Sequence, residues 1–95
     1  SHPDHRGAAT LARQAWVDFG RRFQLAYYEV MPGVQTMDFQ PDWYVDISQS
    51  WKRKRYACQA HHTQCPRRFR DFHAELELRR GAEAAITRAE AFRFA

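Results

Sequence analysis

The chain has 95 residues, of which 44% are hydrophobic and 15% aromatic; this is enough for one small domain with a core and excludes a disordered tail. The formal net charge of +4 permits an anionic partner without arguing strongly for one. No apolar run approaches the roughly 20 residues that a membrane-spanning helix needs. Two cysteines, Cys58 and Cys65, are too few for a disulfide scaffold, so we expect a cytoplasmic protein that could contain a single disulfide.

The first half of the chain predicts one helix and one strand. Apolar residues recur at helical spacing over residues 7–19, with Asp4 placed to cap this helix and Gly20 to end it. Residues 23–30 are short, aromatic and nearly continuous in apolarity, which is typical of a strand buried on both faces. Residues 34–41 are expected to form a loop.

The second half predicts a strand and two helices. Residues 43–47 alternate between apolar and polar, which favours a strand, and Asp46 or Ser48 can cap a helix over 49–61. A long helix with two apolar stripes is expected over 67–92. Strands flanked by helices favour an α/β layer, but two strands do not make a stable open sheet. The expected architecture is therefore the end of a larger sheet.

The opening residues are the first candidate site. His2 and His5 flank Pro3 and Asp4, and the proline fixes the local backbone. One imidazole can bind a metal while the other stabilises charge, and Asp4 can orient a ring by accepting its N–H. The alternative is an exposed terminus without function.

A second cluster could hold a structural metal. Its donors would be Cys58, His61 or His62, and Cys65. The spacing matches no common zinc finger. A small core cysteine followed by histidines near a helix C-terminus is the favoured alternative.

A third cluster is basic and could hold phosphates. It combines residues 52–55 with the arginines 67, 68 and 70, and Trp51 and Tyr56 could stack on bases. The run over 52–55 wraps around the helix axis, and no nucleic-acid-binding motif accompanies it. A solvated surface is therefore favoured, and the sequence disfavours nucleic acid as a partner.

The opening SHPDHR, followed by an alanine-rich helix, resembles the second signature of the LmbE-like, or PIG-L, N-acetylglucosaminyl deacetylases. Later segments look like successive parts of the C-terminal half of that family. They are LAYYEV at 25–30, GVQT at 33–36, YVDI at 44–47, AHHTQ at 60–64, and RG through AEAF at 80–92. The resemblance covers essentially the whole chain, in order.

The resemblance implies a Rossmann-like three-layer α/β fold, of which residues 1–95 would be a single partial domain, the C-terminal half, with two strands and about three helices. It also implies a zinc-dependent hydrolase that removes the N-acetyl group of an N-acetylglucosamine-type or related amino-sugar conjugate. By position, His5 would be the third zinc ligand. His2 would stabilise the oxyanion and protonate the leaving amine, and Asp4 would orient a histidine. The substrate pocket would be bordered by Tyr28, Glu29 and His61.

The largest departure from the family is that the sequence has no His-Pro-Asp-Asp motif, and a minor one is His62-Thr63, where the family more often has an apolar residue and a serine. In the family that motif supplies a histidine and an aspartate to the metal and a second aspartate as the general base. We therefore expect a companion N-terminal half that carries the motif, and no hydrolysis by these 95 residues alone. A homo-oligomer is compatible with the sequence. A basic nucleic-acid-binding module and a noncatalytic domain with a structural metal stay as alternatives.

Overall fold

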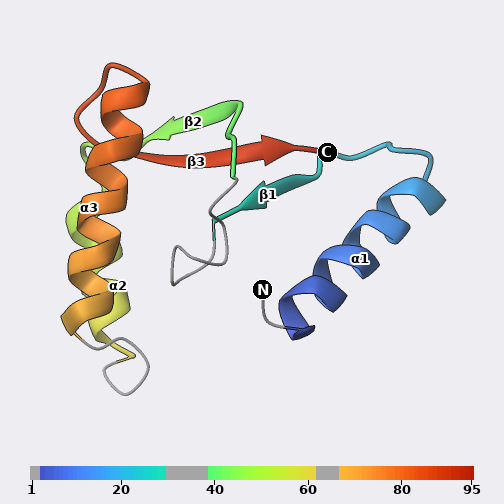
Figure 1. Ribbon diagram of the computed structural model, residues 1–95, viewed down its shortest axis with the longest axis horizontal. Coiled ribbons are helices and arrows are strands. Elements are labelled where there is room, and N and C mark those ends of the chain that lie inside the picture. The colour runs from blue at the N-terminus through green and yellow to red at the C-terminus, as the bar shows by residue number, and fades with distance from the viewer. Residues whose placement is uncertain (1–2, 30–38, 62–66) are drawn as a thin grey trace. The chain divides into compact units, whose positions relative to one another are not determined.

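The computed structural model describes residues 3–29, 39–61 and 67–95. Within them, three helices and three strands follow the order α1, β1, β2, α2, α3, β3 (Figure 1). The strands form one sheet in the order β1-β3-β2. The chain divides into a first unit, residues 1–43 with 92–95, and a second unit, residues 44–91. The expected mixture of helices and strands is confirmed, whereas the expected count of two strands is wrong.

Helix α1 spans Pro3–Asp18 and so begins four residues earlier than its apolar pattern predicts. Proline suits the first position of a helix, because the N–H that it lacks would have no helical partner there. Asp4 lies in the first turn, where its negative charge is favourable near the positive end of the helix dipole. The carboxylate therefore lies inside the helix instead of preceding it as a cap.

The last helical residue of α1 is Asp18, and Gly20 terminates the helix, as predicted. The φ angle of Gly20 is 68°, a left-handed conformation that glycine adopts without steric cost. The Gly20 N–H donates to the Val17 carbonyl at 2.9 Å, and the Arg21 N–H donates to the Trp16 carbonyl at 2.8 Å. This pair of bonds is a Schellman motif, which satisfies the last carbonyls of the helix. No residue of α1 is buried in the described part of the chain, and Leu11 is 73% exposed.

Strand β1 is Ala26–Tyr28, and it pairs antiparallel with β3, Ala89–Phe94, so that Tyr28 lies opposite Phe92. The expectation of a longer strand over 23–30, buried on both faces, is wrong: Tyr28 is 68% exposed. Within the described residues β1 is a three-residue strand at the edge of the sheet, whereas burial on both faces is typical of parallel sheets with a layer packed on each side.

Strand β2, Trp43–Asp46, confirms the strand predicted over 43–47. The Asp42 N–H donates to the Phe92 carbonyl at 3.0 Å, and the Ile47 N–H donates to the Arg88 carbonyl at 3.0 Å. From Asp42 to Ile47 the partner residue moves back from Phe92 to Arg88, so β2 and β3 run antiparallel. The sheet is thus antiparallel on both sides of β3, unlike the parallel sheets of doubly wound folds.

Helix α2 is Trp51–Gln59, which lies within the predicted range of 49–61. Its N-cap is Ser50, without a side-chain hydrogen bond, so the expectation that Asp46 or Ser48 caps it is wrong. The Asp46 carboxylate instead accepts the backbone N–H of Ser48 at 2.9 Å and closes the turn before the helix. Hydrogen bonds from Ser48 lower the pKa of Asp46 below its ordinary value.

Helix α3 is Arg67–Glu83, so the expectation of one helix over 67–92 is wrong. The helix ends in a second Schellman motif, with Ala85 in the left-handed conformation at φ 60°. The Ala85 N–H donates to the Ala82 carbonyl at 3.3 Å, and the Ile86 N–H donates to the Gly81 carbonyl at 2.9 Å.

Gly81 lets the returning chain pass close to α3. A Cβ atom at this position would lie 2.5 Å from the backbone oxygen of Thr87, which is closer than van der Waals radii allow. The close approach turns the chain into β3, where the predicted helical stripe would have continued. Ala89 and Ala91 are buried while Glu90 between them is half-buried, which is the alternation of a strand.

The core of the second unit is small and partly polar. Among its described residues, the buried apolar ones are Ile47, Ala89 and Ala91, and two charged residues of α3, Glu77 and Arg80, are buried as well. Leu78, which falls on one of the two apolar stripes expected over 67–92, is 46% exposed, so that stripe is not packed at this position. Charged side chains therefore occupy core positions that apolar side chains were expected to fill. Ion pairs between them are needed to offset the cost of burying their charges.

Candidate functional site

The histidine expected to bind zinc lies on an accessible part of the chain. His5 is in the first turn of α1, and both it and Asp4 are exposed. Consecutive helical positions do not face each other, so the helix alone does not aim Asp4 at the His5 ring. His2, the expected oxyanion stabiliser, lies outside the described residues.

The residues expected to border the substrate pocket lie on separate parts of the fold. Tyr28 is the last residue of β1, and Glu29 follows it half-buried; both belong to the first unit. His61 follows α2 in the second unit, is exposed, and donates its backbone N–H to the Cys58 carbonyl at 3.0 Å. Over residues 3–29, 39–61 and 67–95 no three His, Cys, Asp or Glu side chains come together as a metal site.

The cysteine cluster offers no free thiol at Cys58. This residue is disulfide-bonded, and a disulfide sulfur does not act as a thiolate ligand. The other two donors proposed there, His62 and Cys65, lie outside the described residues. In this form of the chain, Cys58 would not take part in a structural metal site.

A polar network that sequence reasoning missed joins α2, α3 and β3 within the second unit. The Lys54 ammonium contacts the carboxylates of Glu77 and Glu90, each at 2.8 Å. The Arg88 guanidinium donates to the second oxygen of Glu77 at 3.2 Å. The Glu77 side chain is only 8% exposed, so this carboxylate is paired on both oxygens, as a buried charge must be. The ion pairs hold α2 and α3 side by side (Figure 1).

The pKa shifts in this network follow from its pairing. Burial alone would lower the pKa of Lys54, but the hydrogen bonds and charges of Glu77 and Glu90 outweigh it and raise the pKa. Burial lowers the pKa of His73, and the nearby Lys54 charge lowers it further, against the opposing effect of the two glutamates. At neutral pH the network therefore contains a charged lysine beside a neutral imidazole.

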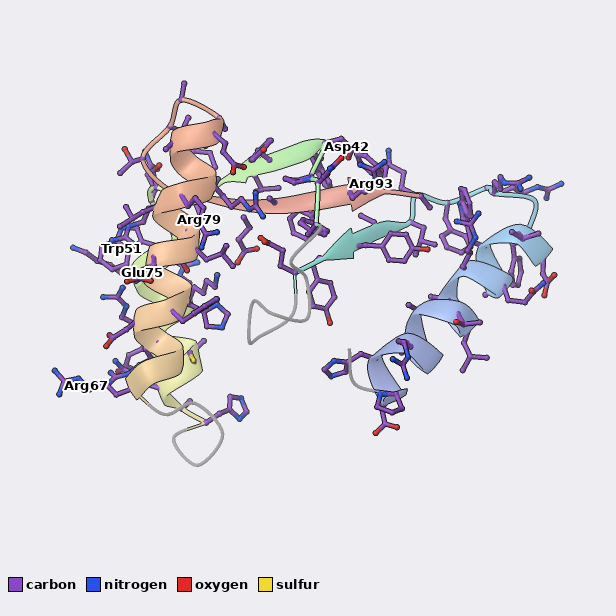
Figure 2. All side chains as sticks on the ribbon, in the orientation of Figure 1. Asp42, Trp51, Arg67, Glu75, Arg79 and Arg93 are labelled. Atoms are coloured by element: carbon purple, nitrogen blue, oxygen red, sulfur yellow. The ribbon has the colours of Figure 1, made fainter. Side chains whose placement is uncertain are left out.

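Trp51 lies at the start of α2 (Figure 2), and three cationic groups lie close to its ring. The guanidinium carbons of Arg88 and Arg55 lie 4.0 Å and 4.6 Å from a ring centroid of Trp51, and the Lys52 ammonium lies 5.7 Å from it. These are cation–π distances. Arginine side chains therefore occupy part of the indole surface on which a nucleic-acid base could stack.

A second polar cluster closes the end of α3. The Arg80 guanidinium donates to both carboxylate oxygens of Glu83, at 2.8 and 2.9 Å, and the Tyr44 hydroxyl donates to one of them at 2.7 Å. Partial burial would raise the pKa of Glu83, but these donors lower it overall. The cluster ties β2 to the helix end and has the character of a structural contact.

A small pocket opens between α2 and α3, with a volume of about 80 Å³. Six of its lining residues carry polar or sulfur atoms: Lys54, Arg55 and Cys58 from α2, and Arg70, His73 and Glu77 from α3. A sequence signal existed for part of this site, because Glu77 falls four residues after His73 and so shares its helix face. Lys54, which lies beside them, comes from α2, and no local sequence pattern predicts its ion pair with Glu77.

Comparisons with protein-family models, with curated proteins and with solved structures gave no match. Among the described residues, no helix combines the length and the apolar character that a bilayer crossing requires.

Proposed function

We propose that this chain is the C-terminal half of a zinc-dependent de-N-acetylase of the LmbE-like, or PIG-L, type. The observation that carries the proposal is the ordered series of family-like segments, which opens with His-Pro-Asp-His at residues 2–5 and ends with AEAF at 89–92. The substrate would be an N-acetylglucosamine-type or related amino-sugar conjugate. We propose the cytoplasm as the compartment of this protein.

In this proposal the sheet is one edge of a larger Rossmann-like sheet. Both β1 and β2 are edge strands, and an edge strand has backbone N–H and C=O groups that a further strand can pair with. The companion N-terminal half would supply that strand. It would also cover α1, whose residues are not buried in this chain.

The described residues do not by themselves fit a tightly held zinc ion. They offer one imidazole of the proposed set, His5, and no cluster of three donors, whereas catalytic zinc sites use three protein ligands. The histidine and aspartate of the companion half would complete the set. When bound, zinc supplies a water of lowered pKa and polarises the acetamide carbonyl.

The residues of this chain have separate proposed tasks. His5 lies exposed at the start of α1, where a metal held by a second segment can reach its imidazole. His2 in its cationic form would stabilise the negative charge that develops on the carbonyl oxygen, and would give its proton to the leaving amine. Asp4 would set the orientation of a histidine ring.

The test measures zinc content and deacetylase activity of the protein together with its His-Pro-Asp-Asp half. We expect His5→Ala to lose zinc and activity together, and His2→Ala to retain zinc while losing most of its turnover. Thr10→Ala, an exposed change on the same helix, is the control and should leave both unchanged. Full activity of His5→Ala would refute the assignment of His5 as a zinc ligand. Zinc loss in His2→Ala would show that the roles assigned to the two histidines are reversed.

A further inference from the structure

The pocket between α2 and α3 carries positive charge beyond what its own ion pairs neutralise. Lys54 and Arg88 are matched by Glu77 and Glu90 within hydrogen-bonding distance. Two more cations, Arg55 and Arg70, line the pocket. Within the described part of the chain no carboxylate forms an ion pair with either of them.

The sequence places no carboxylate next to Arg55 or Arg70 on the same helix face, so no helical neighbour neutralises their charges. Side chains three or four positions apart are neighbours on a helix, and none of those neighbours of Arg55 or Arg70 is acidic. Arg55 is also held in place, because its guanidinium carbon lies 4.6 Å from a ring centroid of Trp51. Both side chains are half-buried, so their charges are less screened than those of fully exposed arginines.

The acidic residue in the lining does not cancel this excess. Glu77 accepts from Lys54 at 2.8 Å and from Arg88 at 3.2 Å, so both of its oxygens are already engaged. The neutral His73 beside it can still donate or accept one hydrogen bond. The charges in the lining that no described carboxylate neutralises are therefore those of Arg55 and Arg70, and both guanidinium groups are hydrogen-bond donors.

From this arrangement we propose that the pocket binds a single phosphate group, held by Arg55 and Arg70 with Lys54 behind them. The planar fork of a guanidinium matches two oxygens of a phosphate, and such charge-assisted bonds are the strong ones. A volume of about 80 Å³ exceeds what one water molecule needs and suits a compact oxyanion. This site is independent of the proposed zinc chemistry at His5.

The experiment titrates inorganic phosphate, and separately the monoester phenyl phosphate, into the full chain by calorimetry at about 0.1 M salt. We expect saturable binding at one site. Arg55→Ala and Arg70→Ala should each weaken binding by about tenfold, the loss expected for one charge-assisted hydrogen bond. Arg70→Gln, which keeps a polar side chain and removes the charge, repeats the test with less disturbance of the helix.

The matched controls are Arg53→Ala on α2 and Arg79→Ala on α3, which remove the same charge from exposed positions outside the pocket lining. Each should change the affinity by less than about twofold, because salt screens exposed charges. Tighter binding of the monoester would identify a phosphorylated small molecule as the ligand, and equal binding would identify free phosphate. Absence of saturation, or equal weakening in controls and pocket variants, would overturn the proposal. So would a single-stranded oligonucleotide that binds more tightly and depends on Arg53 as much as on Arg70.

Discussion

The paired carboxylate of Glu77 makes a quantitative prediction about how the second unit is held together. The Glu77→Gln variant keeps the size of the side chain and removes its charge. Lys54 then retains Glu90 alone, and Arg88, whose side chain is 14% exposed, loses the carboxylate that it contacts at 3.2 Å. Helix α2, helix α3 and the start of β3 would lose a shared contact at once.

The size of the effect follows from the burial of each partner. Removing one member of a fully buried ion pair costs about 3–5 kcal/mol. The cost here is smaller, because the Lys54 side chain is 35% exposed and keeps a second partner, and solvent screens what remains. We expect the free energy of unfolding to fall by about 2 kcal/mol, which lowers the Tm by roughly 10 °C in a domain of this size.

The assay is urea unfolding at neutral pH, followed by far-ultraviolet circular dichroism. Glu75→Gln removes the same charge from an exposed position of α3 (Figure 2) and should change stability by less than about 0.5 kcal/mol. Glu90→Gln should lie between the two, since the Glu90 side chain is 38% exposed. Equal stability of the Glu77 and Glu75 variants would refute the claim that the ion pairs hold α3 to α2.

Three further predictions concern single positions. Gly81→Ala places a methyl group 2.5 Å from the Thr87 oxygen and should destabilise the chain by about 1–3 kcal/mol. Gly7→Ala is the control: a Cβ atom there has nothing within 4 Å, and the change should stabilise α1 by up to about 1 kcal/mol. Similar melting temperatures for the two variants would contradict the close approach at Gly81. Ala85→Gly should raise the Tm, because the residue has a φ of 60° that costs alanine about 1 kcal/mol; a lowered Tm would show that the left-handed turn is not strained. The pKa of His73 in the folded chain is lowered from 6.5, so as the pH falls the unfolded chain binds a proton at this imidazole before the folded chain does. The free energy of unfolding should therefore fall as the pH drops from 6.5 to the lowered pKa, and then level off with respect to this group. His73→Gln should lose that slope in a pH series of unfolding curves, and an unchanged slope would assign it to another group.

The sequence predicts the local features of the fold where the signal is itself local. Gly20 ends α1 because a left-handed residue is needed there, and the alternation over 43–47 becomes β2. The boundary of α3 could not be predicted in this way. Alanine, leucine, arginine and glutamate all favour helix, and residues 84–92 continue that composition, so the pattern runs on past Glu83. The helix stops because Ala85 takes a left-handed conformation and the Thr87 backbone packs on Gly81, which are tertiary events.

The candidate sites differ in the same respect. The His-Pro-Asp-His motif is contiguous, so His5 could be singled out from the sequence, and its zinc role stays a prediction. The pocket between α2 and α3 is made by residues that lie about twenty positions apart, such as Lys54 and Glu77. Residues 52–55 were expected to form a solvated surface, and two of the four turn inward instead, since Lys54 and Arg55 are half-buried.

The two lysines differ in exposure and in ion pairing, so an amine-reactive reagent should modify one of them selectively. Lys52 and Lys54 are the only lysines in the sequence. An amine reacts with acylating reagents only in its neutral form, and the raised pKa of Lys54 together with its two carboxylate contacts keeps that amine protonated and shielded. Lys52 is exposed. Apart from the N-terminal amine, an activated ester should therefore attach a fluorophore at Lys52 and leave Lys54 unmodified, and acylation at Lys54 would begin only when the second unit opens.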